Sequence, residues 1–596
     1  MKRSFRSVVI VMAVLLGVMA LTFSACGESN VWNCPECGKS DNTGNYCGGC
    51  GHPSPWLDAG EAATAENNTE ATQASDTATS EELETNQYML LASQGDASAQ
   101  HALGWRYQHG IGVNQDYAEA MYWYQKAADQ GSASSQNQIG WLYQNGLGVD
   151  QDYAEAFRWY SIAAEKGNAS GQYNIAYAYD LGQGVEQDIA EAFGWYMKAA
   201  EQGTAVAQYE LGWHYQKGIG VDQDYAQAMD WYLKAADQGN ARAQNQIGWL
   251  YSHGLGVEQD YTEAFRWFSM AAENGNANAQ NSIGYAYEHG QGVEQDFSEA
   301  FRWFSMAAEN GNAPAQNNVG YAYEKGQGVE QDYKEAAKWY KKAAEQGNAS
   351  AQVNLGDFYI DGIGVEKDEV QGFNWYMKAA EQGDGVAINN VGWCYKNGVG
   401  VEQDDAEAFK WYMKAAELGN ASAQYAVGYA YDGGRGVEQD DAEAIKWYMK
   451  AAENGNASGQ NNLGYAYEHG RGVEQDYAEA FKWYMKSAEN GNTSGQNNLG
   501  YAYEYGQGVE QDYEEAFKWY MKAAENGSTS AQNAVGYFYV HGLGVEQDYE
   551  EAFKWYMKAA EQGNKTAIGN IGWCYENGVG VEKDPEEAQR WYDMAK

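Results

Sequence analysis

Proline and cysteine are both scarce in this chain of 596 residues, which contains 5 prolines and 7 cysteines. Glycine is plentiful by comparison, with 71 residues. A chain of this kind is expected to consist of regular elements joined by short connectors, without proline kinks. Four of the cysteines lie within residues 34–50, so cysteine chemistry is concentrated in one short segment.

Basic residues are also in the minority, since 38 Lys and Arg stand against 83 Asp and Glu and the net charge is −45. A surface with this charge repels phosphate backbones and anionic lipid, so no nucleic-acid partner is expected. A basic protein or peptide partner, or bound cations, would suit the charge. The alternative is that the acidity only keeps a long chain soluble.

Long hydrophobic runs are missing except near the N-terminus, where residues 8–21 are mostly apolar and follow Lys2, Arg3 and Arg6. The run is short for a membrane span, and this pattern predicts an export signal over residues 1–26. Small residues before Cys26 resemble a bacterial lipobox, which predicts that Cys26 is lipidated and tethers the exported chain to the cell envelope, outside the cytoplasm. Cleavage near Ala25 and an uncut signal anchor are the alternatives.

Two C-x-x-C pairs, Cys34 with Cys37 and Cys47 with Cys50, follow the signal. Four thiolates at this spacing close a tetrahedral zinc (Zn2+) site, so residues 31–52 are predicted to form a small zinc-ribbon-like module. A site with four protein ligands is structural and has no open position for catalysis. Because export leads to an oxidising compartment, two disulfides are the alternative.

A spacer and a helix separate this module from the rest of the chain. Residues 53–79 are rich in Ala, Thr, Glu and Asn without apolar periodicity, which predicts a disordered acidic linker. Thr79 and Glu82 stand in capping-box register and predict a helix start. Residues 80–96 are therefore expected to form a degraded half-repeat that caps the N-terminal end of an array.

From Ala97 to Lys596 the chain repeats one 36-residue pattern fourteen times without insertion or deletion, and we number the copies 1 to 14. Trp123 recurs in every copy as far as Trp591, and Gly104 recurs in all but copy 3, where Ala176 replaces it. Self-similarity at this period is the signature of a solenoid, so the fold is expected to be an all-α stack of helical hairpins.

Each copy contains the pattern of two helices. In copy 1 the first is predicted over 97–109 and is expected to be the shorter of the two. Gly104 lies in its middle, which indicates that a neighbouring helix passes too close for a side chain. Asp116 and Glu119 resemble a capping box at the start of the second helix. The glycines of the G-x-G-V connector, beginning at Gly110, are expected to end the first helix.

The repeated pattern is A-x-A-Q-x-x-L/I/V-G-x-x-Y-x-x-G-x-G-V-x-x-D-x-x-x-A-x-x-W-Y-x-x-A-A-x-x-G, and it resembles the Sel-one-like repeat family, relatives of the tetratricopeptide repeats. The resemblance covers residues 97–596. It implies a right-handed α/α superhelix that acts as an adaptor for other proteins. No catalytic residue is carried over from that family to this chain.

One position of the first helix varies widely between copies and holds Arg106, Leu142, His214 and Phe358 among others. A position that admits Arg and His is not expected to be fully buried, so these four residues are candidate partner contacts. The alternative is drift at a position that tolerates many residues. The sequence thus favours a non-enzymatic protein-interaction scaffold on a lipid tether. A cell-envelope enzyme acting on cell-wall material and a cation-binding acidic coat are the alternative functions, although we find no unrepeated Ser, His and Lys cluster.

Overall fold

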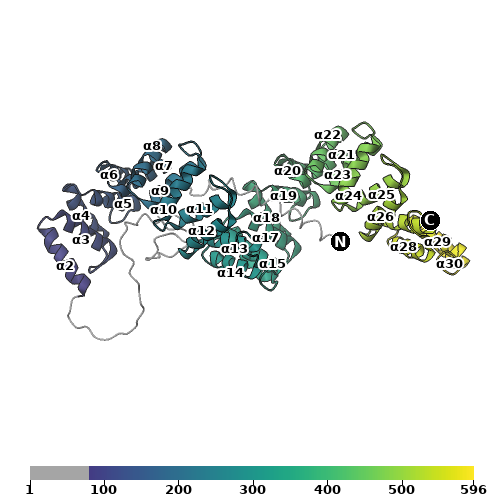
Figure 1. Ribbon diagram of the computed structural model, residues 1–596, viewed down its shortest axis with the longest axis horizontal. Coiled ribbons are helices and arrows are strands. Elements are labelled where there is room, and N and C mark those ends of the chain that lie inside the picture. Colours follow the sequence, from purple (N-terminus) through teal and green to yellow (C-terminus); the bar gives the residue numbers. More distant parts are fainter. Residues whose placement is uncertain (1–78) are drawn as a thin grey trace, which may run out of the picture. The chain divides into compact units, whose positions relative to one another are not determined.

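The computed structural model describes residues 79–596, and every regular element in this part of the chain is an α-helix. There are 29 helices, α2 to α30, in these residues (Figure 1). They belong to two compact units, which contain residues 79–315 and 316–596 of the described chain. The predicted all-α solenoid architecture is therefore confirmed for the described residues.

In the first unit, α2 (Ser80–Ser93) precedes the repeats, and each copy then supplies an A-helix followed by a B-helix. The A-helices are α3 (Ala97–His109), α5 (Ala133–Asn145), α7 (Ala169–Leu181), α9 (Ala205–Lys217), α11 (Ala241–His253) and α13 (Ala277–His289). The B-helices are α4 (Tyr117–Asp129), α6 (Tyr153–Glu165), α8 (Ile189–Glu201), α10 (Tyr225–Ala236), α12 (Tyr261–Glu273) and α14 (Phe297–Glu309).

The second unit begins within α15 and continues the same alternation to the end of the chain. Its A-helices are α15 (Ala313–Lys325), α17 (Ala349–Asp361), α19 (Gly385–Asn397), α21 (Ala421–Gly433), α23 (Ala457–His469), α25 (Thr493–Tyr505), α27 (Thr529–His541) and α29 (Lys565–Asn577). Its B-helices are α16 (Tyr333–Glu345), α18 (Glu369–Glu381), α20 (Asp405–Glu417), α22 (Asp441–Glu453), α24 (Tyr477–Glu489), α26 (Tyr513–Glu525), α28 (Tyr549–Glu561) and α30 (Pro585–Ala595).

The first helix of copy 1 has the predicted bounds, Ala97–His109. The expectation that it is shorter than its partner is wrong, because α3 and α4 each contain 13 residues. Short connections make successive helices antiparallel neighbours, so each copy is a helical hairpin that packs on the next copy.

The start of each B-helix follows the predicted pattern only in part. The Asp116 carboxylate accepts hydrogen bonds from the backbone N–H groups of Ala118 and Glu119, as an N-cap does. The backbone N–H of Asp116 donates to the carbonyl of Tyr107 at 2.9 Å, so Glu119 does not complete a capping box with it. The equivalent Glu407 instead pairs with Lys410 at 2.6 Å.

The core of a copy forms between its two helices and the next A-helix. In copy 1 the side chains of Leu103, Ala120 and Tyr124 are fully buried. A Cβ added at Gly104 would lie 2.7 Å from Cδ1 of Tyr124, so the close neighbour that the sequence indicated is an aromatic ring of the B-helix. The Tyr124 hydroxyl donates to Oε1 of Gln108 at 2.6 Å, which satisfies the buried polar atom.

The connectors end the A-helices as predicted. Gly146 closes α5 with a left-handed backbone, at φ 64°, and Gly148 follows at φ 71°. A Cβ at Gly148 would lie 2.6 Å from the carbonyl oxygen of Tyr117 in the preceding copy. The second glycine therefore lets one copy's connector pack on the first turn of the previous copy's B-helix.

The predicted capping box at Thr79 and Glu82 is present at the start of α2, with both reciprocal hydrogen bonds formed. The predicted signal over 1–26, the four-cysteine module over 31–52 and residues 53–78 of the linker lie outside the described residues. Among the described helices, none has the length and apolar character that a membrane crossing requires.

Candidate interaction surface

The four candidate contacts chosen from the sequence do not lie on the surface. Arg106, Leu142, His214 and Phe358 are buried, with exposed fractions of 7%, 0%, 2% and 4%. The expectation that a position admitting Arg and His cannot be fully buried is therefore wrong. Their side chains pack between copies, where a partner does not reach them.

The two polar members of this set are satisfied by neighbouring groups. Arg106 donates to Oγ1 of Thr85 at 2.8 Å and pairs with the Glu84 carboxylate at 2.5 Å. His214 has its Nδ1 atom 2.9 Å from the carbonyl oxygen of Ile219. Both side chains can thus be buried without an unpaired polar group.

The helical period explains the burial. Position 106 lies seven residues after Ala99 and three after Leu103, which are both buried, so all three share one helix face. The residue type at this position varies between copies, and groups nearby in the fold provide a matching partner for each polar side chain. Sequence variability alone does not show that such partners exist.

In several copies the exposed residue is the one before it, although Trp141 of copy 2 is buried. Thirteen of the fourteen copies carry Trp or Tyr at the position of Trp105, and Asp357 is the exception. Several of these rings are about two-fifths exposed: Trp105 (41%), Tyr465 (43%), Tyr501 (41%), Tyr537 (43%) and Trp573 (39%). The sequence does contain a signal for this surface. An aromatic residue recurs at a helix position that faces away from Ala99 and Leu103.

Cations of the chain lie over some of these rings. The Lys217 ammonium lies 4.7 Å from the centroid of Trp213, and Lys325 lies 5.5 Å from that of Tyr321. The Arg435 guanidinium lies 3.9 Å from the centroid of Tyr429. These distances are those of cation–π contacts.

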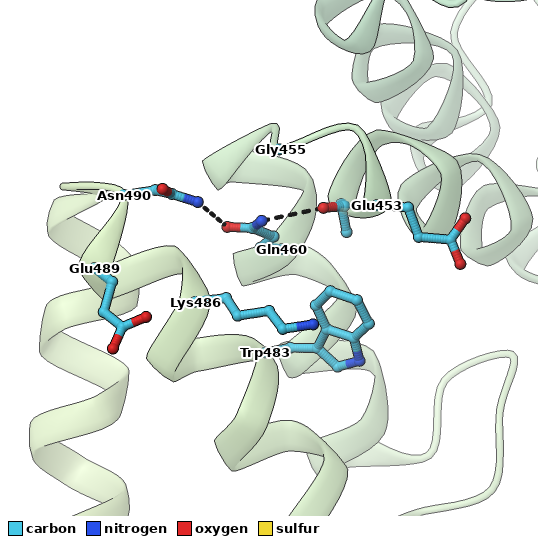
Figure 2. Close-up of a pocket in the computed structure, with 8 residues that line it drawn as sticks. Glu453, Gly455, Gln460, Trp483, Lys486, Glu489 and Asn490 are labelled. Atoms are coloured by element: carbon cyan, nitrogen blue, oxygen red, sulfur yellow. Dashed lines mark hydrogen bonds between the residues drawn. The ribbon is translucent and has the colours of Figure 1, made fainter.

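Trp residues of the B-helices form a second set of recurring aromatic side chains. They include Trp483, which lines an open pocket of about 440 Å³. Lys486 extends along Trp483 (Figure 2), and its ammonium lies 3.9 Å from the ring centroid. Gln460 donates to the carbonyl of Ala452 at 3.0 Å and accepts from Asn490 at 2.9 Å. The same Lys–Trp pair recurs within other B-helices, for example at Lys522 over Trp519. Because Gln460 of copy 11 donates to Ala452 of copy 10, we interpret this arrangement as a packing contact between copies.

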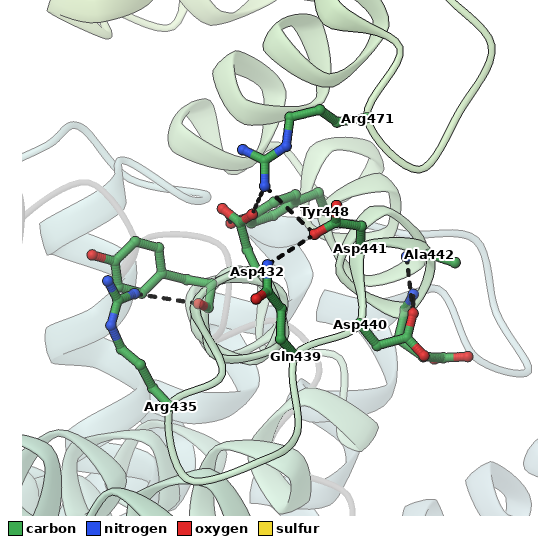
Figure 3. Close-up of polar contacts among 10 residues, drawn as sticks. Asp432, Arg435, Gln439, Asp440, Asp441, Ala442, Tyr448 and Arg471 are labelled. Carbon is green, nitrogen blue, oxygen red and sulfur yellow. Dashed lines mark hydrogen bonds and ion pairs between the residues drawn. The ribbon is translucent and has the colours of Figure 1, made fainter.

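An ion cluster marks copies 10 and 11. Arg471 lies 2.8 Å from a carboxylate oxygen of Asp432 and 3.5 Å from one of Asp441 (Figure 3). Asp432 raises the pKa of Arg471, so the guanidinium stays charged. Asp441 occupies the position of Tyr477 in the following copy, and the cluster lines a pocket of about 220 Å³ with Tyr448 and Tyr465.

In the first unit, Asp180 and Glu210 occupy the repeat positions of Asp432 and Asn462. Burial raises the pKa of Glu210 to about 7; the Asp180 carboxylate acts in the same direction, and Arg242 opposes it. Burial also raises the pKa of Asp180, while His214 and the Tyr196 hydroxyl lower it.

Metal ligands are not gathered in the part of the chain that the structure describes, where no group of three or more His, Cys, Asp or Glu side chains is placed to hold an ion. The predicted ligands Cys34, Cys37, Cys47 and Cys50 and the predicted lipidation site Cys26 lie outside that part. Zinc and lipidation therefore stay predictions.

Comparisons with known proteins agree with this architecture. A crystal structure of c5321, described as a protective antigen of uropathogenic Escherichia coli strains displaying an SLR fold, is 35% identical, with 81% of this chain and 96% of that chain covered and a TM-score of 0.55. A Sel1 repeat protein from Oxalobacter formigenes is also 35% identical over 41% of this chain and 96% of that one, with a TM-score of 0.38. No curated protein matches the chain.

The family description "Sel1 repeat" matches fourteen consecutive segments, from 97–132 to 566–596. These segments follow the 36-residue register read from the sequence and contain the A- and B-helices described above. This chain belongs to the Sel1 repeat family.

Proposed function

We propose that this protein is a non-enzymatic interaction scaffold that is exported, tethered to the cell envelope through a lipid on Cys26, and holds a protein or peptide partner on its repeats. Sel1 repeat proteins are in general protein-interaction scaffolds. The observation that carries the proposal is the row of A-helix aromatic rings, such as Tyr501, that remain exposed although every copy has buried its own core. Exposed aromatic side chains are enriched at protein interfaces.

The predicted lipid anchor and the predicted N-terminal module fit a scaffold that is held at the cell envelope. Lipidation of Cys26 would anchor the chain stably, because a diacyl group supplies more than one hydrocarbon chain. The linker over 53–79 would hold the repeats away from the membrane, at about 25–30 Å for a random coil of this length. Zinc bound by Cys34, Cys37, Cys47 and Cys50 would stabilise a small module between the lipid anchor and the linker.

The test uses the full chain in an expressing bacterium. Mass spectrometry of the mature N-terminus should find a lipid-modified Cys26, and Cys26→Ser should move the protein from the membrane fraction to the soluble fraction. Crosslinking in intact cells, followed by peptide mapping, should place partner crosslinks within 97–596. An unmodified Cys26 would contradict the tether, and crosslinks confined to residues 27–78 would contradict the scaffold.

A further inference from the structure

Copies 11 to 13 present three exposed rings. Each packs against the ring four residues later on its own helix, with centroids 4.1 Å apart for Tyr465 and His469, 4.5 Å for Tyr501 and Tyr505, and 4.3 Å for Tyr537 and His541. Tyr465, Tyr501 and Tyr537 are 41–43% exposed, and we call them the open aromatic strip. Their helices α23, α25 and α27 contain no Lys or Arg. The first two helices contact each other directly, since Asn498 donates to Oδ1 of Asn461 at 3.0 Å. The strip therefore continues directly from copy 11 to copy 12.

Carboxylates accompany two of the rings. Glu468 and Glu504 each lie three residues after a strip tyrosine, on the same helices. One oxygen of each accepts a hydrogen bond from a buried tyrosine hydroxyl, Tyr484 at 2.5 Å and Tyr520 at 2.7 Å. A carboxylate has four acceptor positions, so each can also accept from an incoming cation.

Cations on the neighbouring B-helix are already engaged. On α24, Lys482 pairs with Glu479 at 2.5 Å, and Lys486 lies over Trp483. Arg471, which follows α23, is engaged by Asp432 and Asp441. Glu468 lies 3.8 Å from Nδ1 of His469, so the carboxylate least compensated within the chain is Glu504.

Other copies show which kind of group these rings accept. At the same A-helix position Trp213 is covered by Lys217, Tyr321 by Lys325 and Tyr429 by Arg435. In copies 11 to 13 the residue at the position of Lys217 is His469, Tyr505 or His541, and the residue at the position of Arg435 is Arg471, Gln507 or Leu543. Copies 12 and 13 therefore have no Lys or Arg at either position, and the Arg471 of copy 11 is already paired with Asp432 and Asp441.

We propose that the open aromatic strip, together with Glu468 and Glu504, binds an extended Lys- or Arg-rich segment of a partner protein. This inference rests on the proposed scaffold function and specifies that the partner presents a basic segment. Adjacent packed helices lie about 8–10 Å apart, and an extended chain advances about 3.3 Å per residue. The preferred segment therefore carries a basic residue at about every third position, each placed over one ring.

The test measures binding of a fluorescent 12-residue peptide to the full chain by anisotropy. The peptide carries Arg at every third position in a Gly and Ser background, and its control carries Gln in place of Arg. Replacing Tyr465, Tyr501 and Tyr537 together by Leu should weaken binding about 10- to 100-fold, because each exposed cation–π contact is lost. The matched triple replacement by Phe keeps the rings and should stay within about twofold of the parent chain.

Charge is tested without disturbing the core. Gln108 and Gln144 already accept the same tyrosine hydrogen bond in copies 1 and 2, so Glu468→Gln with Glu504→Gln should fold normally. This pair should weaken Arg-peptide binding and flatten its salt dependence. The control pair Glu489→Gln with Glu525→Gln removes equal charge at exposed B-helix ends and should change binding less than twofold.

Equal binding of the Arg and Gln peptides, or an unchanged affinity in the triple Leu variant, would overturn the inference. Equal weakening by the two Gln pairs would also overturn it, since net charge alone would then explain the binding. If the crosslinked cellular partner still binds the triple Leu variant at full affinity, the scaffold function stands and this strip is not its site. Crosslinks confined to residues 27–78 would contradict the scaffold itself.

Discussion

The ring of Tyr232 rests against Gly212, so that a Cβ added to this glycine would lie 2.5 Å from Cδ1 of the ring. The same glycine–ring contact recurs in other copies, for example between Gly284 and Phe304. It joins the A-helix of a copy to its own B-helix at the closest approach of the hairpin. Packing of this kind, repeated along the chain, stabilises each copy and its neighbours.

Gly212→Ala should therefore destabilise the first unit. The substitution gains about 1 kcal/mol of helix propensity, but the ring of Tyr232 must move, at a cost of about 1–3 kcal/mol or more. We expect a lower urea midpoint and faster amide hydrogen exchange in α9 and α10.

Gly194→Ala is the matched control, because Gly194 also lies within a helix, α8, and has nothing within 4 Å of an added Cβ. It should leave stability unchanged or raise it by up to about 1 kcal/mol. Equal destabilisation by the two substitutions would show that the glycine–ring contact is not the reason for glycine at this position.

Arg106→Ala should detach the N-terminal helix without unfolding the repeats. Arg106 joins α3 to α2 through Thr85 and Glu84, and its guanidinium also lies 5.1 Å from the Tyr88 ring centroid. Loss of this buried group should cost about 1–3 kcal/mol, because it removes the hydrogen bond to Thr85 while the half-exposed Glu84 returns to solvent. Faster hydrogen exchange across 80–93 would show this loss.

Arg158→Ala provides the comparison, since Arg158 forms an exposed pair with Glu155 at 2.8 Å. Exposed pairs of this kind contribute at most about 1 kcal/mol. If the two variants exchange alike over residues 80–93, the account of Arg106 as a buried link is wrong.

Glu210 should make the stability of the first unit depend on pH. Its folded pKa of about 7 exceeds the ordinary Glu value of about 4.3, so between these values the folded state binds a proton that the unfolded state lacks. The contribution is present in full below about pH 4 and is lost as pH rises through 7. Because Glu210 is half-buried, we expect a change on the order of 1 kcal/mol.

Glu210→Gln should remove this pH dependence. The variant should be more stable than the parent chain at pH 8, and the difference should shrink towards pH 4.5 in thermal melts. Glu201→Gln, an exposed change at the end of α8, reports the effect of losing one charge alone. A Glu210→Gln effect that is the same at pH 4.5 and pH 8 would contradict the raised pKa.

The four-cysteine module should bind one zinc ion per chain. Elemental analysis of the full chain should find about one zinc, and changing Cys34, Cys37, Cys47 and Cys50 to Ser should abolish it. The helical content of the repeats should be unchanged, because these residues precede the array. A parent chain with no zinc and no reactive thiols at the four positions would favour the two-disulfide alternative.

Much of the fold follows from the sequence because the repeat is so regular. The bounds of α3, the cap at Asp116 and the helix stop at Gly110 each depend on residues close together in the chain. Local hydrogen bonding and backbone freedom determine such features, and the sequence displays both.

The candidate site was harder to predict because its residues meet across copies. Arg106 can be buried because Thr85 and Glu84, in the preceding helix, accept hydrogen bonds from its guanidinium. Similarly, Arg471 reaches Asp432, 39 residues earlier in the chain, through the stacking of two copies. Variability at position 106 suggested exposure, whereas the exposed ring lies one residue earlier, at Trp105.

Hydrogen exchange of the full chain, with and without its crosslinked cellular partner, tests the scaffold function most directly. The account predicts slower exchange in A-helices that carry exposed rings, foremost α23, α25 and α27, while the interiors of the B-helices stay unchanged. Protection limited to residues 27–78, with every repeat exchanging as in the unbound chain, would contradict it.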